Sequence, residues 1–136
     1  MMKLFLLLLF VFSQQVYAGL VVVVSKDSTV DVLQQEQVEN IFLSKTNRFP
    51  NGDKAIPIEI RGDQSRIGFY QKIADKTPTQ LSAYWTTLVF SGRGKPPKGL
   101  KDLPSLITRL EQTNGTISYL DESQITPNLK VIYRFP

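Results

Sequence analysis

The chain has 136 residues, of which 42% are hydrophobic, and its formal net charge is +4 at pH 7. This length and composition predict one globular domain with a genuine core and exclude a disordered chain. The sequence contains no cysteine and no histidine, so it excludes disulfides and lacks the commonest general base and the commonest nitrogen ligand for metals. The carboxylates are scattered along the chain. We therefore expect no metal, no cofactor and no enzymatic activity.

The first 18 residues have the pattern of a secretory signal peptide. Lys3 gives a positive start, Leu4 to Phe12 is an unbroken apolar run, and Ala18 is a small residue suited to signal peptidase. The apolar run is about half of the roughly 20 residues that a membrane-spanning helix needs. We expect cleavage after Ala18, export to the periplasm, and a single mature domain over residues 19–136 without a membrane span.

The sequence from Leu20 to Ile60 predicts two strands and one helix. Leu20 to Val24 is a continuous aliphatic run, which is typical of a strand covered on both faces. Apolar residues at i, i+3 and i+4 predict an amphipathic helix from about Gln34 to Leu43. The turn at residues 50–53 then leads into a second strand from Ala55 to Ile60.

Two helices are predicted next. In the first, Ile67, Tyr70 and Ala74 recur at helical spacing. The second begins at the capping box of Thr77 to Gln80, with proline at its first position. Its wide apolar face predicts a main packing helix, whose aromatic residues belong to the core rather than to a ligand platform. That face consists of Leu81, Tyr84, Trp85, Leu88 and Val89.

A basic loop rich in glycine and proline, Phe90 to Lys101, breaks that helix. It can line an anion site or dock a partner, but a solvated surface loop is the favoured interpretation. Because its residues are not suited to stacking nucleobases, we expect no nucleic-acid binding. Asp102 can cap a further helix. Alternating residues at Thr116 to Leu120 and at Leu129 to Phe135 predict strands with one covered face.

The order of these elements predicts an α/β fold. Strands that alternate with helices favour a three-layer sandwich built around a mixed, mostly parallel sheet.

The turn from Arg61 to Ser65 passes directly from a strand into a helix. Such a turn directs backbone N–H groups and the positive end of a helix dipole toward an anion. Ser65 is placed to cap the helix and to offer a hydroxyl, Arg61 can form bidentate hydrogen bonds to phosphate or sulfate, and Asp63 can orient Arg61 or accept a proton from a protonated oxyanion. In the alternative, which the residues alone favour, Ser65 or Asp63 only caps the helix while Arg61 pairs with Asp63 in solvent.

Four segments between Val22 and Phe135 resemble, in the same order, the phosphate-binding proteins of bacterial phosphate uptake transporters, within the type II periplasmic binding protein superfamily. VENIFLSK at residues 38–45 is similar to the family's I-F-L-G-K helix end, and RFPNG at 48–52 to the turn that follows. RGDQS at 61–65 resembles R-x-D-x-S, whose arginine and serine contact phosphate, and NGTISY at 114–119 resembles P-G-S-I-G-Y. The chain is most similar to small, exported, single-lobe members.

The resemblance implies one lobe of a type II periplasmic binding protein that acts as an exported, non-enzymatic binding module. Its implied phosphate or oxyanion site consists of Arg61, Asp63, Gln64, Ser65 and Arg66. Arg66-Ile67 stand where the family has Gly-Thr, which removes a threonine hydroxyl and adds a bulky cation. A single lobe leaves the anion half exposed, and a homodimer can supply the missing wall. The alternative function is that of a lobe that serves as a protein–protein interaction or sensory module with an envelope protein partner.

Overall fold

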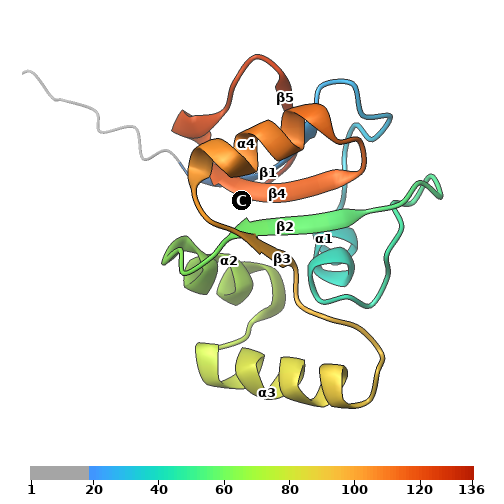
Figure 1. Cartoon of the computed structure of the whole chain (residues 1–136), viewed down its shortest axis with the longest axis vertical. Coiled ribbons are helices and arrows are strands. Elements are labelled where there is room, and N and C mark those ends of the chain that lie inside the picture. Colours follow the sequence, from blue (N-terminus) through green and yellow to red (C-terminus); the bar gives the residue numbers. More distant parts are fainter. Residues whose placement is uncertain (1–18) are drawn as a thin grey trace, which may run out of the picture.

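A five-stranded mixed sheet forms the centre of the fold in the computed structural model, which describes residues 19–136 (Figure 1). The signal peptide predicted at residues 1–18 lies outside the described residues. The strands are β1 (Leu20–Ser25), β2 (Ile56–Ile60), β3 (Lys98–Leu100), β4 (Thr116–Asp121) and β5 (Leu129–Arg134).

The strand order in this sheet is β3-β2-β4-β1-β5. Strand β2 pairs in parallel with β3 and β4, whereas β1 pairs antiparallel with β4 and β5. Four strands therefore run in one direction and β1 runs in the other. The predicted mixed, mostly parallel sheet is confirmed.

Helices cover both faces of the sheet, as the three-layer prediction requires. The helices are α1 (Gln35–Phe42), α2 (Ser65–Ala74), α3 (Pro78–Phe90) and α4 (Leu103–Gln112), and a 3-10 turn, η1 (Glu122–Gln124), precedes β5. Helix α4 lies on one face, and α1 and α2 lie on the other, with α3 farther from the sheet beyond them (Figure 1). The predicted α/β class and layer arrangement are thus confirmed.

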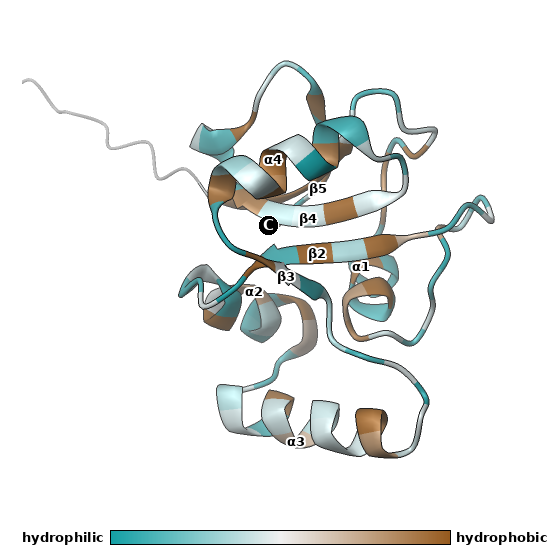
Figure 2. Cartoon of the chain, in the orientation of Figure 1, coloured by the Kyte–Doolittle hydropathy of each residue, from teal (hydrophilic) through white to brown (hydrophobic). Residues whose placement is uncertain are grey.

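Strand β1 separates the two halves of the core. Val22 and Val24 pack in the apolar cluster on the α1 side, and Val21 and Val23 pack in the cluster on the α4 side. All four valines are buried, which confirms the prediction of a strand covered on both faces. Strand β2 alternates between hydrophobic and hydrophilic residues (Figure 2), and its Glu59 is buried on the face opposite Ile58.

Two strand predictions were wrong. Strand β3 was predicted as part of the basic loop, because Lys98, Gly99 and Leu100 carry no apolar pattern. It forms through parallel backbone pairing with β2. Strand β4 was expected to have one covered face, yet Thr116 to Leu120 are all buried, because β4 lies in the middle of the sheet between β2 and β1.

The apolar faces of α2 and α3 also differ from the prediction. In α2, Ile67 is 53% exposed and Phe69 is fully buried instead, because its ring stacks on that of Tyr119 at a centroid distance of 3.9 Å. In α3, Leu81 and Trp85 are buried, which confirms their core role, but Val89 is half exposed. The expectation of a main packing helix is therefore wrong for the C-terminal part of α3, which extends past the core.

Candidate functional site

The turn between β2 and α2 is shaped by a glycine and an aspartate. Gly62 has a φ of 74°, in the left-handed region that glycine adopts without steric cost. The Oδ1 atom of Asp63 accepts a hydrogen bond from the backbone N–H of Ser65 at 3.0 Å. Ser65 is itself the first residue of α2, so the expectation that Ser65 caps the helix is wrong, and Asp63 holds the turn instead.

A cleft of about 460 Å³ opens between this turn and the segment that contains β3. Four of the five residues predicted to bind an anion line the cleft, and Ser65 does not. The lining residues are Glu59, Arg61, Gly62, Asp63, Gln64, Arg66, Ile67, Pro97 and Gly99. Tertiary structure thus adds Pro97 and Gly99, which the sequence offered no means of placing beside the turn.

Arg61 lies at this cleft without a carboxylate partner. Its Nη2 atom donates a hydrogen bond to the carbonyl oxygen of Gly99 at 3.3 Å. Within residues 19–136 Arg61 forms no ion pair, so its alternative pairing with Asp63 is not observed. A Cβ atom at Gly99 would lie 3.3 Å from the Cβ of Arg61, which indicates that glycine allows the two strands' ends to approach here. The charge of Arg61 remains available to a ligand.

Arg66 is engaged differently, because it pairs with a buried carboxylate. Its Nε atom lies 3.2 Å from Oε1 of Glu59, whose side chain is only 8% exposed, whereas that of Arg66 is 33% exposed. The guanidinium carbon also lies 5.2 Å from the ring centroid of Tyr70. Glu59 therefore pairs with the charge of Arg66, and Arg66 does not add a second free charge to the cleft.

The second oxygen of Glu59 is occupied by a tyrosine from the neighbouring strand. The hydroxyl of Tyr119 donates a hydrogen bond to Oε2 of Glu59 at 2.9 Å. Sequence reasoning missed both residues. One signal was present: a carboxylate in an otherwise apolar strand requires a buried partner, and Arg66 follows only seven positions later.

Burial changes the proton affinities of this group. It raises the pKa of Glu59 above its ordinary value of 4.5, although the neighbouring Arg66 and the hydrogen bond from Tyr119 oppose the increase. Burial, together with the charge of Glu59, also raises the pKa values of Tyr119 and Tyr70. Both tyrosines are therefore neutral at physiological pH, and the hydroxyl of Tyr119 can act as a hydrogen-bond donor to Glu59.

Residues 19–136 contain neither a cluster of metal ligands nor a membrane-spanning helix. This part of the chain holds no group of three or more acidic side chains arranged to bind a metal ion. Nor does it contain a helix with the length and apolar character needed to cross a membrane.

Comparisons with known proteins identify the fold. No family model matches the sequence, and no curated protein matches it. Solved structures do match. An ABC-type phosphate transport receptor from Vibrio cholerae has a TM-score of 0.63 at 14% identity, over 84% of this chain and 45% of that one. A phosphate ABC transporter substrate-binding protein with bound phosphate, from Clostridium perfringens, has a TM-score of 0.65 at 12% identity, over 84% and 44%.

A third structure, PstS from Borrelia burgdorferi, has a TM-score of 0.61 at 12% identity, over 84% of this chain and 46% of that one. The chain thus spans less than half the length of each of these proteins. At such low identity the similarity establishes the fold: the chain has the α/β architecture of a phosphate-binding protein lobe. The resemblance drawn from the sequence motifs is confirmed at that level.

Proposed function

We propose that the protein is a non-enzymatic module, exported to the periplasm, that binds phosphate or a similar oxyanion in the cleft beside the β2–α2 turn. The observation that carries the proposal is the state of Arg61, which lines the cleft and contacts a carbonyl oxygen rather than a carboxylate. A guanidinium without an acidic partner offers paired N–H donors in the geometry that phosphate oxygens accept.

Asp63 supports a preference for a protonated oxyanion. Its carboxylate lines the same cleft, and its bond to the N–H of Ser65 keeps it in place. A carboxylate accepts a hydrogen bond from the P–OH group of phosphate but repels sulfate, which carries no proton near neutral pH. We therefore expect phosphate to bind more tightly than sulfate.

The likeness to solved proteins supports the same function. The Clostridium perfringens protein was solved with bound phosphate, and the Vibrio cholerae protein is described as an ABC-type phosphate transport receptor. The signal-peptide pattern at residues 1–18 supports export, and the absence of histidine and cysteine supports a role in binding rather than in catalysis.

Isothermal titration with phosphate and with sulfate, at low ionic strength, tests this proposal. We expect heat of binding with phosphate and a weaker response with sulfate. Arg61→Ala should abolish phosphate binding while circular dichroism shows an intact fold, because the Arg61 side chain is exposed. Arg109→Ala, which removes an exposed arginine from α4 on the opposite face, should bind as the wild type does. Absence of heat at millimolar phosphate would contradict the proposal.

A second candidate function is docking of an envelope partner or of a second copy. The specific observation is that Phe90 and Val89, adjacent on the last turn of α3, are 92% and 53% exposed. Aromatic residues are enriched at protein interfaces. A photocrosslinking amino acid at position 90, tested in intact cells, should yield either a product of twice the chain mass or a larger heterologous product. Absence of any product would contradict this function.

A further inference from the structure

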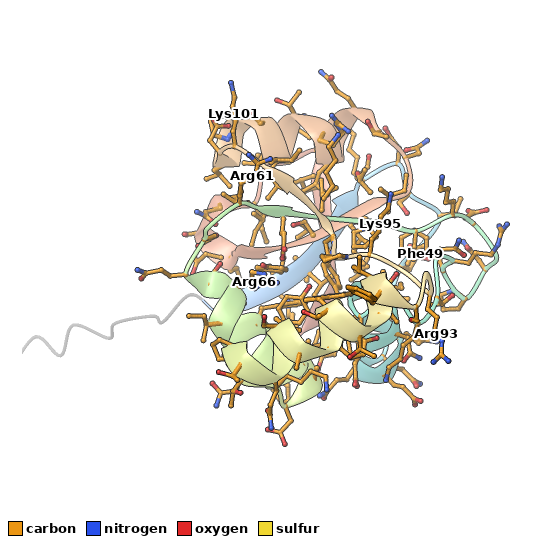
Figure 3. All side chains as sticks on the ribbon, turned by 60° about the horizontal axis from the view of Figure 1, so that its bottom comes forward. Phe49, Arg61, Arg66, Arg93, Lys95 and Lys101 are labelled. Atoms are coloured by element: carbon orange, nitrogen blue, oxygen red, sulfur yellow. The ribbon has the colours of Figure 1, made fainter. Side chains whose placement is uncertain are left out.

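A second cleft, of about 550 Å³, lies between the end of α1 and the loop that joins α3 to β3. It shares no lining residue with the cleft beside the β2–α2 turn. Its lining residues are Ser44, Lys45, Thr46, Asn47, Gly92, Arg93, Gly94 and Lys95. Figure 3 shows Arg93 and Lys95 well apart from Arg61 and Arg66.

The charge of this cleft has one sign. Lys45, Arg93 and Lys95 are its ionisable lining residues, and the others contribute hydroxyl, amide or backbone groups. Lys45 has an acidic partner, because its Nζ atom lies 3.9 Å from Oε1 of Glu39, and the Lys45 side chain is half exposed. The first cleft, by contrast, carries Glu59 and Asp63 beside its two arginines. The second cleft therefore attracts negative charge more strongly.

Close packing holds the two walls of this cleft together. A Cβ atom at Gly94 would lie 2.6 Å from Oγ of Ser44, so only glycine permits this approach without displacement. Ser44 itself has a φ of 60°, a conformation that is uncommon for residues other than glycine. The hydroxyl of Tyr84, on α3, donates a hydrogen bond of 2.6 Å to the carbonyl oxygen of Leu43. The cations are thus presented by a preorganised frame, which lowers the entropic cost of binding.

We propose that this second cleft binds a small multivalent anion with two or more linked phosphate groups, of which pyrophosphate and tripolyphosphate are examples. Its volume is in the range of small-molecule sites, about 300 to 1,000 Å³. The lining residues include three cations and no carboxylate, and the partly exposed pair of Lys45 with Glu39 offsets only part of their charge. An anion that carries several charges balances these cations, whereas one phosphate ion balances only part of them. The guanidinium of Arg93 and the hydroxyls of Ser44 and Thr46 provide directional donors for phosphate oxygens.

Titration calorimetry with sodium tripolyphosphate tests this proposal, with orthophosphate and citrate as comparison ligands. We expect tripolyphosphate to bind more tightly than either, and its affinity to fall as salt is raised. Each lost cation should weaken binding by about tenfold, the value of one charge-assisted hydrogen bond. The double variant Arg93→Ala/Lys95→Ala should therefore lose tripolyphosphate binding at low millimolar concentration.

A charge-matched control separates this site from general attraction. Lys98→Ala/Lys101→Ala removes the same charge from exposed positions a few residues along the chain, outside the cleft, and should bind tripolyphosphate as the wild type does. Arg61→Ala should also retain this binding, so the result does not depend on the proposed phosphate site. Any of four results would overturn the proposal. These are equal losses of tripolyphosphate binding in the two double variants, a loss of that binding in Arg61→Ala, tighter binding of citrate than of tripolyphosphate, and no binding of tripolyphosphate by the wild type.

Discussion

The carboxylate of Glu59 and the hydroxyl of Tyr119 meet at 2.9 Å although the two residues lie 60 positions apart in the sequence. They face each other from the parallel strands β2 and β4. Arg66 occupies the other carboxylate oxygen, and the Tyr119 ring stacks on Phe69. The floor of the proposed phosphate cleft is therefore built into the core, where Arg66 from α2 balances the charge of Glu59 on β2 and Tyr119 from β4 donates a hydrogen bond to it.

Loss of Arg66 should destabilise the protein, because Glu59 would be left buried without its cation. Removal of one partner from a buried pair costs about 3 to 5 kcal/mol. Arg66 is one-third exposed, which reduces the effect, so we expect Arg66→Ala to lower the free energy of unfolding by about 1 to 3 kcal/mol. Urea denaturation followed by circular dichroism measures it.

The neighbouring Arg61 supplies the matched control for that measurement. Its side chain is exposed and forms no ion pair within residues 19–136, so Arg61→Ala should change stability by less than about 0.5 kcal/mol. The double variant Arg66→Ala/Glu59→Gln should lose less than the sum of the two single variants, because the two side chains interact. Equal losses in Arg61→Ala and Arg66→Ala would show that the pair with Glu59 has no stabilising role.

Tyr119→Phe should remove one hydrogen bond and leave the ring stack on Phe69 in place. A buried carboxylate oxygen then loses its donor, which costs about 1 to 3 kcal/mol. Tyr133→Phe is the control, because the Tyr133 hydroxyl donates to exposed Gln35 at 3.4 Å, and we expect little change. Thermal unfolding of both variants distinguishes the two sites; equal melting temperatures would contradict the role given to the Tyr119 hydroxyl.

Stability should fall with increasing pH in a window that Glu59 defines. Burial raises the pKa of Glu59 above its ordinary value of 4.5, so the folded state binds this proton more readily than the unfolded state. The contribution of Glu59 to the free energy of unfolding is therefore fully present below pH 4.5 and is lost as pH rises through the raised pKa.

The measurement is the difference in unfolding free energy between the wild type and Glu59→Gln as a function of pH. Relative to this variant, the wild type should become less stable as pH rises from 4.5. The pKa values of Asp102 and Asp121 are lowered from 3.8 by hydrogen bonds from Ser105 and Ser123. These carboxylates stabilise the fold above pH 3.8 and lose that effect only as pH falls, outside the Glu59 window. A pH-independent difference would refute the assignment.

Two glycines should respond to alanine in opposite directions. Gly68 lies within α2, and a Cβ atom there would meet nothing within 4 Å, so Gly68→Ala should stabilise the protein by about 0.5 to 1 kcal/mol. Gly115 has a φ of 90°, and its Cβ would lie 2.7 Å from the carbonyl oxygen of Lys54. Gly115→Ala should therefore destabilise by more than about 1 kcal/mol. Urea denaturation of both variants checks the two signs.

Local patterns in the sequence were sufficient for most elements, because their causes lie within a few residues. The capping box at Thr77 and the aspartate cap at Asp102 both form as predicted. The aliphatic run at Leu20 predicted a strand buried on both faces. The predicted order of strands and helices was also enough to indicate the layered α/β class.

Within the candidate site, sequence alone located the turn and its arginines but not their partners. The sequence predicted both Arg61 and Arg66 as anion ligands. In the structure Arg66 forms an ion pair with Glu59, whereas Arg61 lies at the cleft and its guanidinium donates a hydrogen bond to the carbonyl oxygen of Gly99. That division depends on strand order. Parallel pairing of β2 with β3 brings Gly99 to Arg61, and pairing with β4 brings Tyr119 to Glu59. Such contacts join residues about 40 to 60 positions apart, and no local periodicity encodes them, so only the tertiary structure decides which charge is free.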